Sequence, residues 1–544
     1  MRQNAGANPR RNPRTAPLRS VGCPGYAALG GPGNRGHRGP AALRILALKL
    51  FGLPPDLQRP KTPLRLRACN TLGMALRKTK IIATIGPACD EPRTLASMIE
   101  AGMNVARINL SHGTFDEQRA RIERVRSAAQ QKEANLAILI DTRGFEIRTG
   151  PVEGGGAVLV AGQPFALHCT PTAGDEHGVS VSFNGIAEIL KVGDRVVIDD
   201  GKIELVVSAL RQGRVDCEVT CGGTLRDRKG VNLPDTQLIR DDLDEGSHAD
   251  LDFAAEIAAD YVAASFVQTG KDVDEIRRHL ESRQTTIPII AKIENGLGVQ
   301  NLETIIERAN GAMVARGDLG VELPVTQLPH IQKHIIRTTV SRGKPVITAT
   351  QMLDSMERNP RPTRAEVSDV ANAILDGSSA IMLSGETAAG LHPVEAVSTM
   401  AELALSAEAS LEEYGTLQNV VGNPSDAIVE AVAQAAITMA KHIDAAAIIA
   451  LTDTGFTARS ISKFRPHCPI FAVTGSESVR RRLAMNWGVT PILYPGHGDD
   501  DESIEFAVRY GSERGHLRPR DVIVATAGRS QMSGGTDMIQ VRRV

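Results

Sequence analysis

Eight short apolar runs alternate with amphipathic stretches along the 544-residue chain, and this alternation constrains the fold more than any other feature. Each run has the length of a buried strand, and the stretches between the runs have helical spacing, for example Pro92–Ala101, Val273–Ser282, Val325–Ser341 and Pro362–Leu375. Eight strands that are each followed by a helix predict a (β/α)8 barrel. The predicted strands are Lys80–Ile85, Asn104–Ile108, Leu136–Ile140, Tyr261–Ser265, Ile287–Lys292, Gly311–Ala315, Pro345–Ala349 and Ala380–Leu383.

Residues 150–234 interrupt the alternation between the third strand and its helix. The segments VGDRVVIDDGKIELVVSAL and RVDCEVT alternate apolar and polar residues around Asp-Gly and Gln-Gly turns. This pattern predicts a small all-β domain inserted on a βα loop. Because βα loops open at the active-site end of a barrel, the insertion can close over a site there.

A second α/β pattern begins after about Glu413. The apolar runs AAAIIAL, PIFAVT, TPILY and DVIVATA are separated by helical stretches, and Met538–Val544 reads as a last strand. We interpret this part as a doubly wound α/β domain. The predicted bounds are 74–149 and 235–412 for the barrel, 150–234 for the inserted domain and 413–544 for the C-terminal domain.

Residues 1–73 differ from the rest in composition. They carry thirteen Lys and Arg against one acid, Asp56, and are rich in Pro, Gly and Arg. Such a stretch cannot bury enough apolar surface to offset the entropy of ordering, so we expect disorder. A basic arm for nucleic acid and an organelle presequence are alternatives. Because the first good strand, KIIATIG, follows Met74, we favour a start at Met74, with 1–73 outside the native fold.

Composition excludes several classes of function for the chain as a whole. The net charge is −1, which argues against a nucleic-acid binder, and no run of about 18 apolar residues predicts a membrane span. The seven cysteines form no CxxC pair and no Cys/His metal spacing. This usage is typical of a reduced interior, so we expect a cytoplasmic protein.

Polar residues stand directly after six of the predicted barrel strands. In a (β/α)8 barrel, catalytic side chains gather at these carboxyl ends, so six such ends together predict a site at one rim. The ends read VARINLSHG (105–113), LIDTRGFEIRTG (139–150), IIAKIEN (289–295), AMVARGDLG (312–320), VITATQM (346–352) and IMLSGET (381–387).

Glu294 and Asp318 follow neighbouring strands and form a candidate Mg²⁺ or Mn²⁺ site, because hard cations prefer oxygen ligands. The alternative is a pair of surface carboxylates bonded to loop amides. Lys292 lies two residues before Glu294, so both side chains face the same side of a strand. Its ammonium suits a phosphoryl group, although a buried salt bridge to a barrel carboxylate would also explain it.

Other groups at this rim suit anions and cations. Arg107 is a second anion ligand or a rim salt bridge, and the amides of Gly317 and Asp318 can bind a carboxylate or phosphate. Four oxygen-bearing side chains from two strand ends suit a monovalent cation, although turn and capping bonds use the same groups. These four are Asn109, Ser111, Asp141 and Thr142.

Long motifs then identify a family. From about Leu76 to the end, roughly 470 residues, the chain closely resembles pyruvate kinases. The resemblance implies the same three-domain fold and transfer of the phosphoryl group of phosphoenolpyruvate to ADP, giving pyruvate and ATP. The motifs are TKIIATIGPA, VARINLSHG, DTRGFEIRTG, RKGVNLP, AKIENGLGVQNL, MVARGDLGVELP, QKHIIRTTVSRGKPVITATQMLDSM, NPRPTRAEVSDVANAILDG and AIMLSGETAAG.

The resemblance also implies residue roles. Glu294 and Asp318 would bind Mg²⁺ (or Mn²⁺), Lys292 and Arg107 the phosphoryl group, and Gly317, Asp318 and Thr350 the substrate carboxylate. Asn109, Ser111, Asp141 and Thr142 would bind K⁺, and Glu146 is an acid where K⁺-independent members have Lys. The nucleotide would contact Asn109, His112, Arg148 and Lys229, and Thr350 and Glu386 would relay the proton. Thr452, Thr454, Gly455 and Thr457 would bind a phosphorylated effector in a homotetramer, where capping by Thr is the alternative.

Some positions depart from the family pattern. Phe145 and Arg143 differ from the usual DTKGPE loop, Ser379 replaces an acid, and PDTQLIRDDLDEGSHADLDFA lacks the usual LTEKD motif.

Two rival hypotheses are another metal-dependent barrel enzyme of enolpyruvate chemistry and a non-catalytic nucleotide sensor. The first lacks the β insertion and the KGVNLP and TATQMLDSM stretches, and Lys292, Glu294, Asp318 and Thr350 argue against the second.

Removal of residues 1–73 should change neither the melting temperature nor the turnover of the chain, because this segment has no pattern that packs on a core. Calorimetry and a rate assay on the chain starting at Met74 test the expectation. A large fall in the melting temperature or in the turnover rate would show that the segment is part of the fold.

Overall fold

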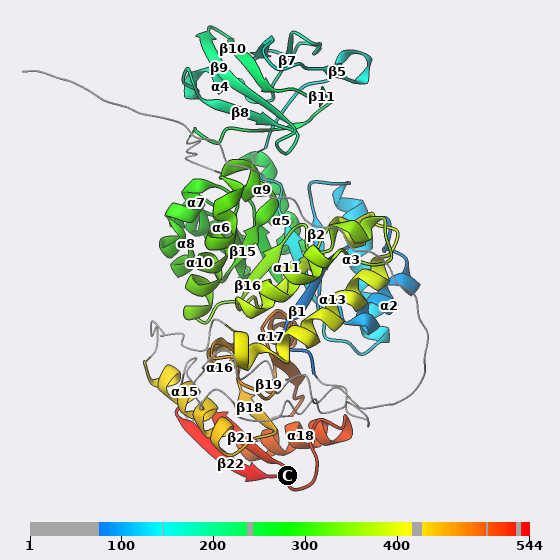
Figure 1. Ribbon diagram of the computed structural model, residues 1–544. Helices are drawn as coiled ribbons and strands as arrows, with labels where there is room; N and C mark the ends of the chain where they lie inside the picture. Colours follow the sequence, from blue (N-terminus) through cyan, green and yellow to red (C-terminus); the bar gives the residue numbers. More distant parts are fainter. Residues whose placement is uncertain (1–75, 145, 237–242, 416–426, 497–498, 529–534) are drawn as a thin grey trace, which may run out of the picture. The chain divides into compact units, whose positions relative to one another are not determined.

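The computed structural model describes residues 76–144, 146–236, 243–415, 427–496, 499–528 and 535–544. Within these residues, eight parallel strands close into a barrel, as the alternation predicts (Figure 1). Around the barrel, the strands are β1 (Lys80–Thr84), β2 (Val105–Asn109), β3 (Ala137–Asp141), β13 (Tyr261–Ala264), β14 (Ile289–Ile293), β15 (Gly311–Ala315), β16 (Val346–Ala349) and β17 (Ala380–Leu383).

Alternate residues of each barrel strand face two different apolar cores, which is why the strands read as continuous apolar runs. Ile82, Ile290 and Met313 belong to the inner core, whereas Ile81 and Ile289 pack against helices. The helices of the barrel are α2 (Pro92–Ala101), α3 (Phe115–Gln131), α5 (Glu245–Glu256), α6 (Gly270–Ser282), α7 (Gly296–Gln300), α8 (Leu302–Arg308), α9 (Arg316–Glu322), α10 (Leu328–Ser341), α11 (Arg364–Leu375), α12 (Gly385–Ala388), α13 (Pro393–Glu408) and α14 (Leu411–Tyr414).

A β domain, here called the inserted domain (residues 147–232), follows β3 and has its own apolar core around Phe165 and Leu167. Its main sheet has the order β4-β12-β8-β9-β10-β6-β7, and β5 pairs with β11. The elements are β4 (Ile147–Arg148), β5 (Ala157–Val158), β6 (Pro164–His168), β7 (Gly178–Ser180), α4 (Ile186–Ile189), β8 (Arg195–Ile198), β9 (Ile203–Arg211), β10 (Arg214–Cys221), β11 (Thr224–Leu225) and β12 (Gly230–Asn232).

The C-terminal α/β domain has a sheet with the order β20-β19-β18-β21-β22, and only β22 of these strands runs antiparallel to its neighbour. Ile448 and Ile449 face opposite sides of the sheet and enter separate cores, as in a doubly wound fold. The elements are α15 (Ala427–His442), β18 (Ala447–Leu451), α16 (Phe456–Lys463), β19 (Ile470–Thr474), α17 (Glu477–Leu483), β20 (Val489–Leu493), α18 (Asp500–Glu513), β21 (Val522–Ala527) and β22 (Met538–Arg543).

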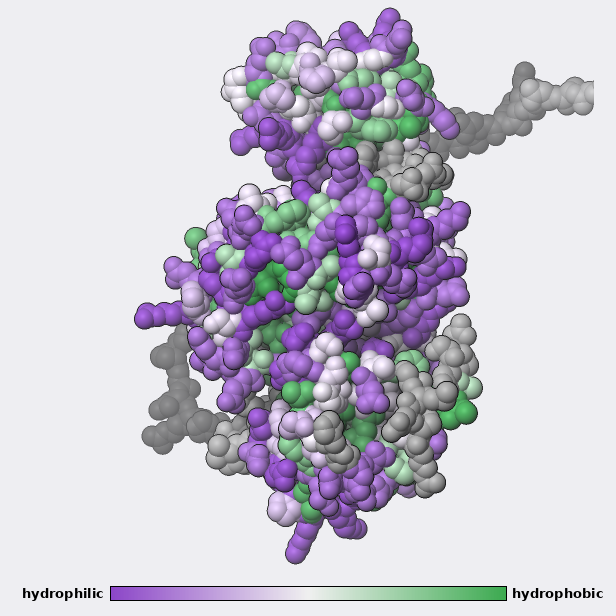
Figure 2. Space-filling view, turned by 180° about the vertical axis from the view of Figure 1, so that it is seen from behind, coloured by the Kyte–Doolittle hydropathy of each residue, from purple (hydrophilic) through white to green (hydrophobic). Residues whose placement is uncertain are grey.

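Hydrophilic residues cover most of the inserted domain and barrel on the side shown in Figure 2, as expected when the apolar faces are used inside. At the amino end of the barrel, Met485 of the C-terminal domain joins the inner barrel core, and Lys80 Nζ donates to the carbonyl of Val489 at 2.7 Å.

None of the described helices is both long and apolar enough to cross a bilayer.

Two of the positions that depart from the family pattern, Arg143 and Ser379, have contacts that the structure describes. Arg143 donates from Nε and Nη2 to Asp250 Oδ1 at 2.9 and 2.6 Å and so ties the loop after β3 to α5. Ser379 accepts from Arg465 Nη2 at 3.2 Å, just before β17. Phe145 and residues 237–242 of the PDTQ segment lie outside the described residues.

Candidate active site

Lys292 is the centre of the polar cluster at the carboxyl end of the barrel. Its Nζ lies 3.0 Å from Asp141 Oδ1 and 2.8 Å from Glu294 Oε1, and it donates to Ser265 Oγ at 2.6 Å. The two-residue spacing of Lys292 and Glu294 therefore places both on one side of β14, as predicted. The salt bridge weighed as an alternative for Lys292 is present as well, because its ammonium pairs with two barrel carboxylates.

Opposite charges compensate each other in this cluster. Burial by itself raises the pKa of Asp141, but the charges of Arg107 and Lys292 outweigh burial and hold that pKa below its ordinary value. For Lys292, burial lowers the pKa, and the charges of Asp141 and Glu294 reverse this effect and raise it. The ammonium of Lys292 and the carboxylate of Asp141 are thus both charged at neutral pH.

Arg107 joins the cluster from β2. Its Nε donates to Asp141 Oδ2 at 2.7 Å, and its Nη1 donates to Thr84 Oγ1 at 2.9 Å. The rim salt bridge considered for Arg107 is therefore present. The side chain of Arg107 is 11% exposed, and its guanidinium pairs with Asp141, the carboxylate that also pairs with Lys292.

The sequence interpretation missed three groups that hold this cluster. Thr84 ends β1, Ser265 follows β13, and the backbone amide of Phe266 donates to Glu294 Oε2 at 2.5 Å. Thr84 and Ser265 stand at the ends of the first and fourth strands, which are not among the six strand ends with a run of polar residues. A single hydroxyl after an apolar run was the available signal, and it is common at strand ends.

Asp318 lies in the first turn of α9 beside Glu294. Burial and the negative charge of Glu294 raise the pKa of Asp318 to about 7. Among the described residues, no group of three or more His, Cys, Asp or Glu side chains is arranged to hold a metal ion. Two carboxylates that repel each other nevertheless fit Mg²⁺, which keeps several waters and substrate oxygens besides one or two carboxylates, because a cation relieves the repulsion.

Thr350 follows β16 with a positive φ of 64°, which is uncommon for a β-branched residue. Its Oγ1 accepts from the amide of Gly317 at 2.8 Å and donates to the carbonyl of Ala349 at 2.7 Å. Arg316 Nη2 in turn donates to the carbonyl of Thr350 at 2.6 Å. The structure thus brings together Gly317 and Thr350, two of the groups that the resemblance assigns to the substrate carboxylate.

The four oxygens predicted for a monovalent cation have local hydrogen bonds of the kind weighed as the alternative. Asn109 Oδ1 accepts from the amide of Ser111 at 3.1 Å. Thr142 Oγ1 donates to the carbonyl of Ala263 at 3.3 Å, and Asp141 belongs to the Lys292 cluster. Of the four, Asp141 and Thr142 lie next to Ser265, and Asn109 lies opposite Asp141 in the pairing of β2 with β3.

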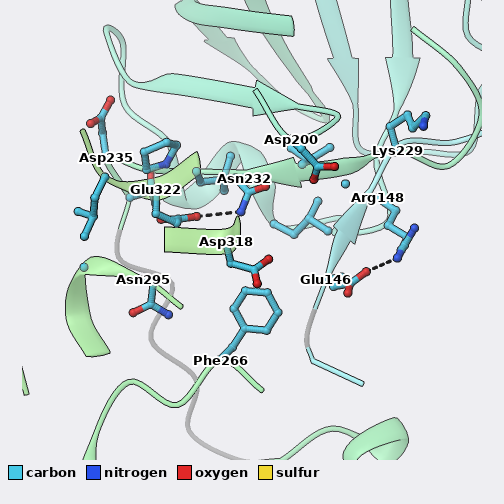
Figure 3. Close-up of a pocket in the computed structure, with 18 of the residues that line it drawn as sticks. Glu146, Arg148, Asp200, Lys229, Asn232, Asp235, Phe266, Asn295, Asp318 and Glu322 are labelled. Atoms are coloured by element: carbon cyan, nitrogen blue, oxygen red, sulfur yellow. Dashed lines mark hydrogen bonds and ion pairs between the residues drawn. The ribbon is translucent and has the colours of Figure 1, made fainter. Parts of the chain in front are cut away.

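A pocket of about 530 Å³ is lined by the inserted domain and the barrel rim (Figure 3). Asp318 and Phe266 line it from the barrel, and Arg148 and Lys229 line it from the inserted domain. Arg148 pairs with Glu146, and Lys229 Nζ lies 2.9 Å from Asp199 Oδ1. Both cations predicted for the nucleotide therefore face this pocket, each with a neighbouring carboxylate. His112 is exposed on the loop after β2.

Glu386 is buried on α12, and burial raises its pKa. Its carboxylate accepts from the amides of Leu353 and Ser384 at 3.0 and 2.7 Å. The bond to Leu353 fixes the loop after β16, which also carries Thr350, whereas the bond to Ser384 is local to the end of β17. The link between Glu386 and Thr350 thus runs through the backbone of this loop.

The predicted effector loop precedes α16 in the C-terminal domain. Thr452 Oγ1 accepts from the amide of Gly455 at 2.9 Å, and Thr457 Oγ1 lies 2.5 Å from Thr536 Oγ1. The carbonyl of Thr454 accepts from Arg459 Nη1 at 3.0 Å, and Gly455 has a positive φ of 79°. The hydroxyl of Thr452 thus closes the turn before α16, and the hydroxyl of Thr457 contacts Thr536. The N-cap of α16 is Gly455 and has no side-chain cap bond, so neither Thr caps this helix.

Comparison with known proteins agrees with this architecture. Family models described as "Pyruvate kinase, barrel domain" and "Pyruvate kinase, alpha/beta domain" match residues 76–397 and 430–542. The chain belongs to the pyruvate kinase family. A pyruvate kinase of Bacillus licheniformis is 45% identical over 469 residues, which is 86% of this chain and 80% of that protein. One of Geobacillus stearothermophilus is 46% identical over 455 residues, covering 83% and 78%.

The crystal structure of a pyruvate kinase from Cryptosporidium parvum has the same fold, with a TM-score of 0.81 and 36% identity over 86% of this chain and 96% of that one. The chain is therefore an enzyme that transfers the phosphoryl group of phosphoenolpyruvate to ADP. Membership of the pyruvate kinase family also implies a metal-dependent enzyme. Both rival hypotheses, another barrel enzyme and a non-catalytic sensor, are wrong.

Replacement of Asp318 by Asn should raise the melting temperature of the metal-free protein at pH 8. The folded state holds a proton on Asp318 up to a pKa of about 7, whereas the ordinary value is 3.8. Stability contributed by the neutral carboxyl is therefore lost as the pH rises from about 4 through 7. We expect a gain of roughly 2–4 °C at pH 8, measured by calorimetry in EDTA, and a smaller gain at pH 5.

The control is Asp116→Asn, because the side chain of Asp116 is 96% exposed on α3. This variant should give the same difference from wild type at both pH values. An Asp318→Asn gain that is as large at pH 5 as at pH 8 would contradict the raised pKa.

Proposed function

We propose that the cluster around Lys292 is the catalytic centre and that the metal is Mg²⁺ or Mn²⁺, held by Glu294 and Asp318. The observation that carries the proposal is the position of a charged ammonium, 2.8 Å from Glu294, in a cluster that also contains Arg107. When bound, the cation offsets negative charge on the transferred group and orients its oxygens. Two cationic side chains beside a carboxylate pair suit a ligand that carries both a phosphate and a metal.

Phosphoryl transfer depends chiefly on positioning and charge neutralisation, because the transition state is loose. Lys292 would neutralise the transferring group, and Arg107 would hold the phosphate of phosphoenolpyruvate. Both side chains are fixed by Asp141, so they need little reorganisation when substrate binds. The charge of Asp141 also raises the pKa of Lys292.

The remaining substrate groups would bind beside this cluster. The amides of Gly317 and Asp318 and the hydroxyl of Thr350 would hold the substrate carboxylate, with the substrate replacing the bond between Gly317 and Thr350. After transfer, Thr350 would pass a proton to the enolate, and Glu386 would support the relay through the loop after β16. The nucleotide would bind in the 530 Å³ pocket, with its phosphates on Arg148 and Lys229 and with Asn109 and His112 nearby.

Regulation is proposed on the resemblance. The enzyme would be a cytoplasmic homotetramer, and a phosphorylated metabolite would bind at Thr452, Thr454, Gly455 and Thr457. Backbone amides at the start of α16 support an anion site there. The hydroxyl bonds of Thr452 and Thr457 mean that the amides, more than the hydroxyls, would carry the binding.

A coupled assay for pyruvate formation tests the proposed function. Turnover should need phosphoenolpyruvate, ADP and a divalent cation together, and Glu294→Gln or Asp318→Asn should abolish the response to Mg²⁺. Mg²⁺ titration curves like those of the wild type in both variants would remove the metal assignment.

K⁺ should activate the enzyme, because Asp141 and Thr142 would hold the ion and Glu146 brings no positive charge of its own. Replacing K⁺ with tetramethylammonium should lower turnover by at least about tenfold, since a charge near the phosphates is lost. Glu146→Lys should recover part of this activity without K⁺. Glu153→Lys makes the same charge change at an exposed position of the inserted domain and serves as the control.

An unchanged rate in tetramethylammonium would show that no monovalent cation takes part. Equal recovery by Glu146→Lys and Glu153→Lys would show an effect of net charge alone.

A further inference from the structure

Helix α9 connects the barrel rim to the inserted domain. Its first turn carries Gly317 and Asp318, and its last residue is Glu322. Glu322 Oε1 accepts a hydrogen bond from Asn232 Nδ2 at 3.0 Å, as Figure 3 shows. Since α9 rises about 1.5 Å per residue, Asp318 and Glu322 are about 6 Å apart along its axis.

Asn232 is fixed within the inserted domain. It ends β12, which pairs with β4 on one side and with β8 on the other. A rotation of this sheet therefore moves the Asn232 side chain with it. The bond to Glu322 passes such a movement to the end of α9.

The first turn of α9 is held by the barrel. Arg316 Nε donates to the carbonyl of Ala349 at 3.1 Å, and Arg316 Nη1 donates to Asp369 Oδ2 at 2.6 Å. The amide of Gly317 donates to Thr350 Oγ1. Helix α9 has seven residues. Arg316 fixes its first turn to the barrel, and Glu322 bonds its last turn to the inserted domain, so a movement of that domain can shift the whole helix.

Because Glu322 is partly buried, its charged carboxylate depends on the hydrogen bond from Asn232. Burial raises the pKa of Glu322, and the hydrogen bond from Asn232 opposes this effect. Arg195 and Asp235 form an ion pair next to it, at 2.9 Å. A partly buried carboxylate that loses a donor becomes costly, so α9 would shift to find a new partner for Glu322.

We propose that the Asn232–Glu322 hydrogen bond sets the position of α9 and thereby the affinity of the Glu294–Asp318 pair for its divalent cation. Asn232 and Glu322 are positioning residues, and the inference rests on the proposed metal role of Asp318. Orientation of the inserted domain and assembly of the metal site are then one coupled event. The nucleotide pocket and the metal site share this helix, because Asp318 and Glu322 both line the pocket.

Mn²⁺ binding without substrate, measured by electron paramagnetic resonance, tests the proposal. Asn232→Ala and Glu322→Ala should each weaken Mn²⁺ binding about five- to tenfold, because part of the free energy of the lost hydrogen bond is transmitted to the metal site. The double variant should be no weaker than either single variant, because both remove one interaction. Glu322→Gln should bind Mn²⁺ within about twofold of wild type, since its amide oxygen accepts the same bond.

Kinetics give a second readout. The half-saturation concentrations for Mn²⁺ and phosphoenolpyruvate should rise in the Ala variants, with a smaller change in kcat. If Asn232→Ala does not fold, Asn232→Asp keeps the side-chain shape and removes the donor, and it should give the same loss. Glu256→Ala on α5, whose partner Arg119 is also on the barrel surface, is the control and should behave as wild type.

Wild-type Mn²⁺ affinity in Asn232→Ala and Asn232→Asp would overturn the proposal. Additive losses in the double variant would overturn it too, because the two residues would then act separately. Failure of the proposed metal role is a different result, since Asp318→Asn would then keep wild-type Mn²⁺ affinity.

Discussion

The ammonium of Lys292, held between Asp141 and Glu294, is the interaction on which the rim of the barrel depends. Each of the two carboxylate side chains is only 1% exposed, and a buried carboxylate is costly unless a cation pairs with it. Parallel pairing of β3, β13 and β14 supplies the geometry, because Asp141 lies opposite Ala263 and Ala264 lies opposite Ala291. The three strands therefore end side by side, and their terminal polar groups meet.

Beside the ion-paired cluster around Lys292 lie two groups whose conformation or charge would be unfavourable in isolation. Asp318 is a buried carboxyl beside another carboxylate, and Thr350 has a positive φ. Thr350 is fixed by Arg316, whose guanidinium also bonds to Ala349 and Asp369. Strain and repulsion at a site are expected where a ligand of opposite charge relieves them, and the fold tolerates them because the barrel core is extensive.

The sequence predicted the parts of the site that follow from local periodicity. Lys292 and Glu294 share a face because side chains two apart on a strand do so, and Asp318 follows the next strand of the barrel. Ser265 and Thr84 were missed because one hydroxyl after an apolar run has many structural explanations. The contact of Asn232 with Glu322 joins residues 90 positions apart on different domains, and no local pattern reports such a contact. The turn bonds of Asn109 and Thr452 likewise appear only in the three-dimensional structure.

The most direct test of this account is turnover and metal binding in Lys292→Met. Methionine keeps much of the side-chain length and removes the charge, so the account predicts a loss of at least about 10³-fold in kcat from the missing stabilisation of the transferring group. Mn²⁺ binding should stay close to wild type, because Glu294 and Asp318 remain. Turnover within tenfold of wild type, in a variant that binds Mn²⁺ normally, would contradict the central role of Lys292.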